Sequence, residues 1–438
     1  MASSNGDRRI RFLPLKYSSR DSEQSVLRLI FALRPEWESS GSAIEIVRFT
    51  DGITNTLLKV VNKAIGLSSD EVDREAILLR AYGHGTDLII DRQREARNHE
   101  LLMHFGLAPE LLARFENGMM YRFIRGTVTR PEDLRRPDVS AAIARRLAEW
   151  HAVVPCIPQQ AYENGVTVHK LINKAANGVR SNDIPDDEAN CGARHDENAA
   201  PYRAADALVS GRLEPNIWSV MQKWIFALPT ETDADKQRRA VLQKELLQLI
   251  ADLSQRPGLG DNGLVFSHND LLSGNVIMLP PKAGGQELVE VAFIDYEYAV
   301  PSPAAFDIAN HFAEWGGFDC DMSVMPTVSQ RRDFINEYMR SYARLCPSLA
   351  RRPSHFDVPS EAEKLLREVD VFRGLPGFYW GIWALIQATI SEIDFDYASY
   401  AETRLSEYWA WKAEISGERA ALNSEMPLRE RRWAQETD

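Results

Sequence analysis

A change of hydrophobic pattern near residue 127 constrains the fold of this chain more than any other feature. Before it, short runs rich in β-branched and apolar residues alternate with turn residues, which is typical of strands. After it, helical periodicity prevails, and strand signals remain only around residues 275 and 291. The sequence therefore predicts an α+β protein, with a small β-rich part followed by a larger, mainly helical part.

The β-rich part has enough signals for one small sheet. The predicted strands are 44–49, 56–61, 75–81, 111–115 and 119–124. Glu116-Asn117-Gly118 between the last two is a strong hairpin signal, and 92–105 has the periodicity of a covering helix. We expect a five-stranded antiparallel sheet with one helix.

Domain boundaries follow from these patterns. We expect a flexible arm at 1–22, with a short helix starting near Ser22, then the β-rich domain at 23–127 and the helical domain at 128–438. Within the helical domain, 177–206 is acidic and poor in large apolar residues, so it cannot offset its ordering entropy by burial. We interpret it as an exposed, disordered insertion.

Composition narrows the class of protein. The net charge of −12 gives no global basic field, so nucleic acid is not an expected partner. The longest apolar run, 377–390, has 14 residues and is too short to cross a bilayer, which favours a buried helix. With no signal-peptide pattern and four scattered cysteines, we expect a cytoplasmic protein without disulfides.

The segment 265–279 is the most informative for chemistry. It places His268, Asp270 and Asn275 in the pattern H-x-D-x4-N between apolar flanks, and Asp295 follows a second apolar run. Phosphoryl transfer needs such a set: one carboxylate accepts a hydroxyl proton, while an Asn and a second Asp hold Mg²⁺ on the phosphates of ATP. Asp270 and Asn275 could instead be turn residues and Asp295 a cap, and His268 fits a structural role better than a proton shuttle.

Two charged residues of the β-rich part could contact phosphates. Arg80 on the third predicted strand and Glu95 on the following helix are placed to pair, and an Arg can hold phosphate bidentately. A weak surface pair is the alternative. The Asp51–Asn55 turn, with a single glycine, indicates by itself only a hairpin.

Five segments together resemble the choline/ethanolamine kinase family. They are DGITNTLLKV at 51–60, ILLRAYGHGTDLIIDRQREARNHELL at 77–102, VFSHNDLLSGNVIML at 265–279, FIDYEYAVPSPAAFDIANHFAEW at 293–315 and FYWGIWALIQATISEIDFDYASYA at 378–401. HNDLLSGN, IDYEY and YGHGTDLIIDR are more similar to ethanolamine kinases than to choline kinases. The resemblance implies a protein-kinase-like two-lobe fold that transfers the γ-phosphoryl group of MgATP to a small amino alcohol.

The resemblance also implies roles for single residues. Asp270 becomes the catalytic base, and Asn275 and Asp295 become the Mg²⁺ ligands. ATP is expected to bind at Asn55, the Arg80–Glu95 clamp, and Phe123 and Ile124 of a hinge spanning 120–124. The acceptor pocket is expected to comprise Glu314, Trp380, Trp383, Phe395 and Tyr400.

The acceptor residues can also be argued from their chemistry. Trp380 and Trp383 share one helix face, and an aromatic wall beside a carboxylate suits an ammonium group, although such a pair is more often part of a core. Glu314 in an apolar context calls for a cation, and a primary ammonium has three N–H donors where choline has none. We therefore expect ethanolamine as the acceptor.

Some features differ from the family pattern and leave alternatives open. Asp51-Gly52 replaces a glycine pair, VPSPAAFD carries two unusual prolines, and the pocket wall near 315–319 has no assignment by analogy. A choline or dual-specificity kinase, another small-molecule phosphotransferase and a non-catalytic kinase-like scaffold are the alternatives. A homodimer is compatible with the sequence, which does not decide the oligomeric state.

Overall fold

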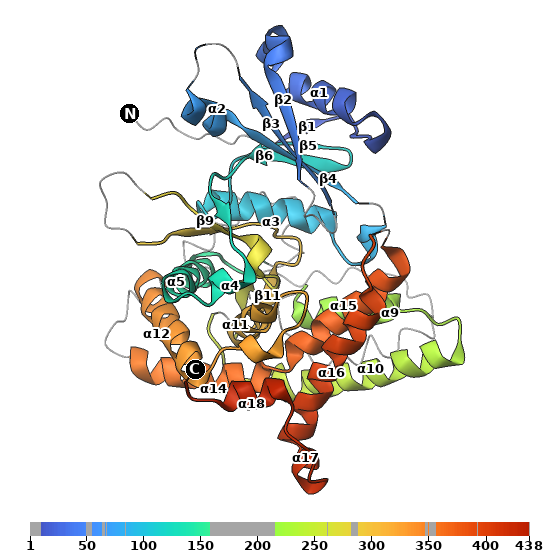
Figure 1. Ribbon diagram of the computed structural model, residues 1–438, viewed down its shortest axis with the longest axis vertical. Helices are drawn as coiled ribbons and strands as arrows, with labels where there is room; N and C mark the ends of the chain where they lie inside the picture. The colour runs from blue at the N-terminus through green and yellow to red at the C-terminus, as the bar shows by residue number, and fades with distance from the viewer. Residues whose placement is uncertain are drawn as a thin grey trace, which may run out of the picture. The chain divides into compact units, whose positions relative to one another are not determined.

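The chain of 438 residues divides into two compact units, Met1–Thr127 and Val128–Asp438, in a computed structural model (Figure 1). The structure describes residues 10–49, 55–63, 66, 68–83, 85–157, 215–260, 262–281, 288–346, 349, 356–391 and 393–437. The expected acidic insertion at 177–206 and the first nine residues of the expected arm lie outside these ranges.

The first unit is built on a six-stranded sheet with the order β1-β5-β6-β4-β3-β2. Its strands are β1 Arg11–Leu13, β2 Ile44–Phe49, β3 Asn55–Asn62, β4 Ile77–Tyr82, β5 Leu111–Phe115 and β6 Gly118–Arg122. The five antiparallel strands and the β5–β6 hairpin confirm the sequence prediction. The count of five was wrong, because β1 joins parallel to β5 from within the expected arm. Three residues are too few to show an alternating pattern, and only the pairing with β5 defines this strand.

Helices cover both faces of this sheet. The helical segments are η1 Ser19–Asp21, α1 Ser22–Leu33, η2 Pro35–Ala43, α2 Ser69–Glu75, η3 Thr86–Leu88 and α3 Arg92–His104. Leu29 and Ile30 of α1 pack in one apolar cluster with Val60 and Leu79. Ala96 of α3 belongs to a separate cluster, together with residues of strands β5 and β6. More than one helix therefore covers the sheet, and the prediction of a single covering helix was wrong.

Helix α2 lies between the predicted strands 56–61 and 75–81, where the sequence predicted no helix. None of its residues is buried, so no apolar stripe marks it. It is stabilised by a capping box, in which Ser68 and Glu71 satisfy each other's backbone N–H groups. The S-x-x-E spacing was the signal for this helix.

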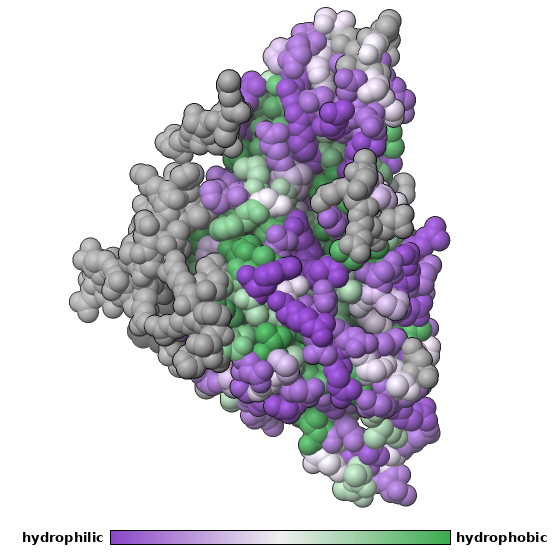
Figure 2. Space-filling view, turned by 90° about the vertical axis from the view of Figure 1, so that its left-hand side faces the viewer, coloured by the Kyte–Doolittle hydropathy of each residue, from purple (hydrophilic) through white to green (hydrophobic). Residues whose placement is uncertain are grey.

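The second unit is mainly helical, as predicted. Its helices are α4 Pro131–Leu134, α5 Pro137–Val153, α9 Ile217–Ala227, α10 Asp233–Leu253, α11 Ala304–Ala313, α12 Val328–Leu345, α14 Val358–Phe372, α15 Leu375–Ile390, α16 Tyr397–Ile415, α17 Glu418–Ala421 and α18 Leu428–Ala434, with 3-10 turns η5 Ser273–Asn275, η6 Glu314–Gly316 and η7 Met322–Val324. None of the described helices is long and apolar enough to cross a membrane. On the face shown in Figure 2, polar residues cover most of the surface, with smaller apolar areas between them.

The loops that contain the predicted site residues follow short strands of this unit. These strands are β8 Val265–Ser267, β9 Val276–Met278, β10 Val291–Phe293 and β11 Val300–Ser302, while β7 Thr127–Val128 spans the unit boundary. β9 pairs antiparallel with β10, and β11 pairs antiparallel with β8. The predicted strands near 275 and 291 are confirmed as β9 and β10, whereas β8 and β11 were not predicted.

Helices α15 and α16 lie side by side in close contact. The apolar run at 377–390 is part of α15 and is largely buried, as expected. A Cβ added to Gly377 would come within 2.6 Å of the Arg404 carbonyl oxygen, and one on Gly381 within 2.7 Å of the Leu405 side chain. The glycines thus permit the close helix approach that places the aromatic face of α15 beside the polar residues of α16.

Candidate active site

The H-x-D-x4-N segment forms a closed loop after β8. The Asn275 Nδ2 group donates to the Asp270 carbonyl oxygen at 2.8 Å and to the Asp270 Oδ2 atom at 3.0 Å. Asp270 is 6% exposed, and its Oδ1 atom is buried without a hydrogen-bond partner among the described residues. Because the Nδ2 atom of Asn275 is committed to Asp270, its Oδ1 atom is the one left to accept from a ligand.

Asp307 of α11 anchors this loop from beneath. Its carboxylate accepts the backbone N–H of His268 at 2.9 Å and that of Asn269 at 2.8 Å. It also contacts His151 Nε2 at 2.9 Å, and His151 Nδ1 lies 2.7 Å from the Tyr338 hydroxyl. Burial by itself would raise the pKa of Asp307, but the hydrogen bonds from His151 and the loop lower it below its usual value. The fully buried carboxylate is therefore ionised and holds the backbone next to Asp270 in place.

Sequence reasoning missed both Asp307 and His151. The signal for Asp307 was a charged residue in the otherwise apolar stretch AAFDIA, the same signal that drew attention to Glu314. His151, at the end of an amphipathic helix, gave no separate signal.

His268 joins the loop to the neighbouring strand. Its Nε2 atom lies 3.0 Å from the Ile294 carbonyl oxygen, one residue before Asp295. Burial lowers the pKa of this imidazole to about 4, so the ring is neutral at physiological pH. These contacts favour the structural role that the sequence suggested for His268.

Asp295 follows β10 in a left-handed conformation, with φ of 66°, which Asp and Asn tolerate better than other side chains. The backbone N–H of Ile294 donates to the Asn275 carbonyl oxygen at 3.0 Å, so the two expected metal-ligand segments are directly hydrogen-bonded. A carboxylate oxygen of Asp295 also lies within 4.8 Å of one from the buried Glu297. Burial, with the charges of Asp295, Glu314 and Glu297, raises the pKa of Asp270 well above its usual value. Such a concentration of acidic groups calls for a cation.

Hydrogen bonds join Trp380 of α15, through Asn310, to the loop that carries Asp270. Trp380 Nε1 donates to Asn310 Oδ1 at 2.8 Å, and Asn310 Nδ2 donates to the Asn269 carbonyl oxygen at 3.0 Å. Trp383 Nε1 donates to the Tyr298 hydroxyl at 2.8 Å, and the two indole rings meet edge to face at 5.5 Å. Both indoles therefore have fixed orientations beside the loop.

The remaining aromatic residues continue this wall through ring contacts. Between ring centroids, Tyr397 lies 5.8 Å from Trp383 and 4.8 Å from Phe395. The ring centroid of Phe395 lies 5.6 Å from that of Tyr400. Phe318 contacts both Phe395 and Tyr400 at 6.1 Å, in the segment to which the sequence assigned nothing. Phe318 and Phe395 are 42% and 39% exposed, whereas Trp380, Trp383 and Tyr400 are buried. The four predicted aromatic residues thus belong to one connected cluster with an exposed end.

Glu314 has a cationic partner within the protein. Its Oε1 atom accepts from Arg404 Nη2 at 2.8 Å, and both side chains are buried. Burial raises the pKa of Glu314, while Arg404 opposes the shift. The sequence argument expected a substrate cation at Glu314 and missed Arg404, a cationic partner within the protein 90 residues away.

In the first unit, Arg80 and Glu95 form a buried ion pair. Arg80 Nε lies 3.1 Å from Glu95 Oε1, with side chains 5% and 3% exposed, so the alternative of a surface pair is wrong. Arg92 shares the same carboxylate, with Nη1 3.0 Å from Glu95 Oε2, and donates to the Thr86 hydroxyl. Sequence reasoning missed Arg92.

The other residues expected to bind ATP lie in two places of the first unit. Phe123 stacks on Phe49 at 6.2 Å with nearly parallel rings, and Lys59 Nζ lies 4.2 Å from its ring centroid. Strand β6 extends to Arg122, so only Phe123 and Ile124 of the expected 120–124 hinge leave the strand. Asn55 begins β3 opposite Tyr82, and the turn before it lies outside the described residues.

Comparison of structures defines the class of fold. The chain is similar to a solved ethanolamine kinase from Plasmodium vivax, with a TM-score of 0.63 and 23% identity over 89% of each chain. This is the protein-kinase-like fold expected from the resemblance, with a small sheet-based unit and a larger helical one.

The family is shown by sequence comparison. The choline/ethanolamine kinase family model matches residues 46–409, and the chain belongs to this family. It is 32% identical to ethanolamine kinase 2 of Mus musculus over 395 residues, which cover 89% of this chain and 81% of the relative. It is also 32% identical to a probable ethanolamine kinase of Nematostella vectensis over 393 residues, 90% of this chain and 94% of the relative. As a member of a kinase family, the protein uses ATP as the phosphoryl donor.

Proposed function

We propose that this protein phosphorylates the hydroxyl group of ethanolamine with ATP, giving phosphoethanolamine, the first intermediate of the CDP-ethanolamine route to phosphatidylethanolamine. The observation that carries the proposal is the buried Asp270 carboxylate, with Oδ2 held by Asn275 and Oδ1 without a partner among the described residues. This carboxylate lies on a loop that Asn310 joins to the aromatic wall. The arrangement supports a base for the hydroxyl beside a pocket for the ammonium group.

Asp270 acts as the base in this proposal. Its raised pKa makes it a stronger proton acceptor than an exposed carboxylate, which suits removal of a hydroxyl proton near neutral pH. Asn275 fixes the Oδ2 atom, so Oδ1 is the oxygen that orients the substrate hydroxyl and accepts its proton. Asp307 restrains the loop backbone and thereby the direction of the carboxylate.

The donor set of the second loop fits magnesium. Asn275 Oδ1 and the Asp295 carboxylate are hard oxygen ligands of the kind that Mg²⁺ prefers, and their segments are hydrogen-bonded to each other. In this proposal, Asn275 and Asp295 hold the metal. Bound Mg²⁺ neutralises charge on the β- and γ-phosphate oxygens.

The first unit supplies the nucleotide contacts in this proposal. The Arg80–Glu95 pair presents a fixed guanidinium for the phosphates, oriented by a carboxylate that Arg92 also holds. Phe123 and Ile124 leave β6 where the adenine is expected, and Asn55 follows the turn that is expected to cover the phosphates.

Ethanolamine is favoured over choline by the relatives, which are named ethanolamine kinases, and by the chemistry of Glu314. A primary ammonium can donate hydrogen bonds to a carboxylate oxygen, whereas a trimethylammonium group has no donor. The aromatic cluster of Trp380, Trp383, Phe395 and Tyr400 offers ring faces to either cation.

The decisive experiment is ADP release by the purified protein with MgATP, measured in parallel on ethanolamine and choline. A kcat/KM for ethanolamine about tenfold higher, roughly 1.4 kcal/mol of transition-state discrimination, supports the proposal. Equal values would make it a dual-specificity kinase, and a preference for choline would reverse the assignment. No turnover with either would move the function to another acceptor or to a non-catalytic scaffold.

Two further expectations belong to this proposal. A cytoplasmic location goes with soluble substrates, and cell fractionation tests it. Sedimentation of the purified protein decides between a monomer and a homodimer.

A further inference from the structure

Arg404 contacts two residues of the proposed acceptor pocket at once. Its guanidinium is fully buried. Nη2 donates to Glu314 Oε1 at 2.8 Å, and Nε donates to the Tyr400 hydroxyl at 2.8 Å. One planar side chain on α16 therefore fixes both a carboxylate from η6 and an aromatic residue from the wall.

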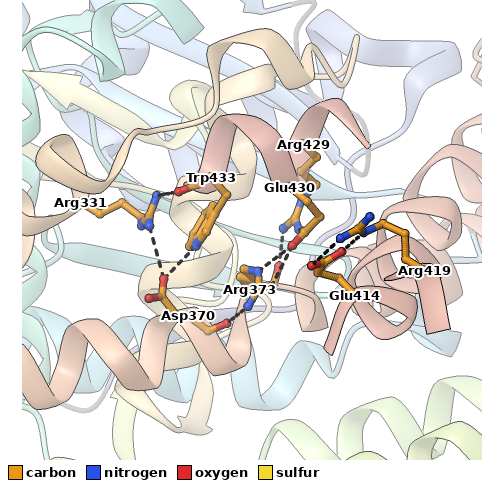
Figure 3. A network of polar contacts seen from close by, with 8 residues as sticks. All are labelled: Arg331, Asp370, Arg373, Glu414, Arg419, Arg429, Glu430 and Trp433. Atoms are coloured by element: carbon orange, nitrogen blue, oxygen red, sulfur yellow. Dashed lines mark hydrogen bonds and ion pairs between the residues drawn. The ribbon is translucent and has the colours of Figure 1, made fainter. Parts of the chain in front are cut away.

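The far side of Arg404 continues into a buried network of alternating charges. Arg404 Nη1 lies 3.6 Å from Glu407 Oε2, and that oxygen lies 3.8 Å from Arg429 Nε on α18. Arg429 in turn pairs with Glu430, which also binds Arg373 (Figure 3). The series runs Glu314, Arg404, Glu407, Arg429, Glu430, Arg373, with three acids and three bases.

Charge balance in this network has a consequence for Glu314. Its negative charge is compensated by Arg404 before any substrate binds, so the carboxylate can remain ionised in a buried place. Oε1 is used by Arg404, and no hydrogen bond from the described residues reaches Oε2. Glu314 thus keeps one acceptor oxygen for a ligand.

Other charged groups around η6 do not replace Arg404. The titratable and charged groups on the elements packed against η6 or near Glu314 are Asp307 and His311 on α11, Glu132 and Asp133 on α4, Asp321 before η7, Tyr400, Arg404 and Glu407 on α16, and Cys320 and Asp270. Burial lowers the pKa of His311 to about 4, so it is neutral. Arg135, which follows α4, is a further cation nearby and acts on Asp321, whereas Arg404 is the cation that acts on Glu314.

We infer that Arg404 is a positioning residue that determines acceptor selectivity, by keeping Glu314 ionised with one oxygen available to a primary ammonium group. This inference rests on the proposed function. A primary ammonium gains a charge-assisted hydrogen bond from that oxygen, whereas a trimethylammonium group gains only the attraction of the charge and the ring faces. Arg404 therefore acts through Glu314 and does not need to touch the substrate.

Loss of Arg404 should convert Glu314 into a titrating group. Burial already raises the pKa of Glu314, Arg404 opposes this, and Glu407 adds to it, so Arg404→Met raises the pKa further. Protonated Glu314 has no charge to offer an ammonium group. In this variant the KM for ethanolamine should be high at acidic pH and fall as rising pH ionises Glu314.

The test measures kcat and KM for ethanolamine and for choline, at pH values on both sides of neutrality. It compares wild type with Arg404→Met, Arg404→Lys, Glu314→Gln and the Arg404→Met/Glu314→Gln double variant. For Arg404→Met we expect the preference for ethanolamine to fall about tenfold or more at acidic pH, mainly through KM, with a smaller change for choline. Arg404→Lys keeps the charge and should restore much of the preference.

The double variant separates positioning from structure. If Arg404 acts through Glu314, the double variant and Glu314→Gln show the same low selectivity and no pH dependence, because the effects are not additive. Equal losses for both acceptors without pH dependence would mean that Arg404 only stabilises the fold, and the inference would be wrong. An unchanged preference in Arg404→Met would also overturn it.

The test still decides if the Arg404→Met variant does not fold, and it separates failure of this inference from failure of the proposed function. If Arg404→Met does not fold, the comparison of Arg404→Lys with Glu314→Gln still decides, because the inference requires the first to keep the preference and the second to lose it. If wild type does not phosphorylate ethanolamine, the proposed function is wrong. If wild type prefers ethanolamine but the preference does not depend on Arg404, only this inference is wrong.

Discussion

Replacement of Asp307 by Asn tests whether this residue anchors the loop that carries Asp270, the proposed base. In wild type, Oδ2 accepts from the His268 backbone N–H and lies 2.9 Å from His151 Nε2, and Oδ1 accepts from the Asn269 backbone N–H. An Asn side chain has one acceptor oxygen, so in its better orientation the oxygen replaces Oδ2 and an amide NH₂ faces the N–H of Asn269. At least one buried donor is then left without an acceptor.

The expected loss of stability follows from the number of hydrogen bonds that Asp307→Asn removes or weakens. An unsatisfied buried donor costs about 1–3 kcal/mol, and the other two hydrogen bonds lose their charge assistance, so we expect the free energy of unfolding of Asp307→Asn to fall by about 2–5 kcal/mol. Displacement of the backbone next to Asp270 should lower kcat by roughly 10- to 100-fold.

Urea unfolding followed by tryptophan fluorescence measures the loss, since every tryptophan except Trp37 lies in the unit Val128–Asp438. ADP release measures kcat. Asp321→Asn is a matched control in the same unit, because Asp321 is exposed and only caps η7, and it should cost about 1 kcal/mol or less. If Asp307→Asn behaves like this control in both assays, the anchoring role is refuted.

The pH dependence gives a second check on the same residue. The folded pKa of Asp307 is lowered, so its stabilisation is fully present above the unfolded pKa of about 3.9 and is lost as the pH falls through the folded pKa. The stability difference between wild type and Asp307→Asn should therefore shrink below about pH 4. A difference that stays constant into this range would contradict the assignment of an ionised carboxylate.

Four further predictions concern other residues of the protein. Asp270→Ala should lower kcat by about 10²–10⁴-fold while calorimetry finds ATP binding largely kept, and Asp295→Ala should abolish Mg²⁺-dependent turnover; near-wild-type activity in either would remove its assigned role. Arg80→Met should raise the KM for ATP about tenfold or more without changing the KM for ethanolamine, and a rise in both would point to general damage. Gly377→Ala should destabilise by about 1–3 kcal/mol in urea unfolding and cost more than Gly381→Ala, because the added Cβ meets the Arg404 backbone rather than the movable Leu405 side chain.

Much of the fold followed from local patterns. The β5–β6 hairpin and the helices α3 and α15 were predicted because turn chemistry, periodicity and apolar runs involve only neighbouring residues. The elements not predicted include the strands β1, β8 and β11 and the helix α2, which depends on capping. Three residues carry no period, and β9 and β10, of the same length, were predicted from their apolar residues alone.

The same division applies to the candidate site. The pattern H-x-D-x4-N drew attention to Asp270 and Asn275, and the structure shows their side chains hydrogen-bonded across five residues. Asp307 and Arg404 could not be recognised as partners, since their contacts span 39 and 90 residues. Which charged side chain meets which carboxylate at such separations depends on how helices pack.

The sequence by itself thus determined the chemistry that the protein carries: the acidic and amide groups of the loop, the aromatic face of α15 and the family to which it belongs. Only the tertiary structure decided the state of those groups. Burial and the partners brought by α11 and α16 keep Asp307 ionised, raise the pKa of Asp270 and compensate the charge of Glu314. The physical reason is that desolvation and charge pairing depend on distance in space, which a linear spacing of residues does not contain.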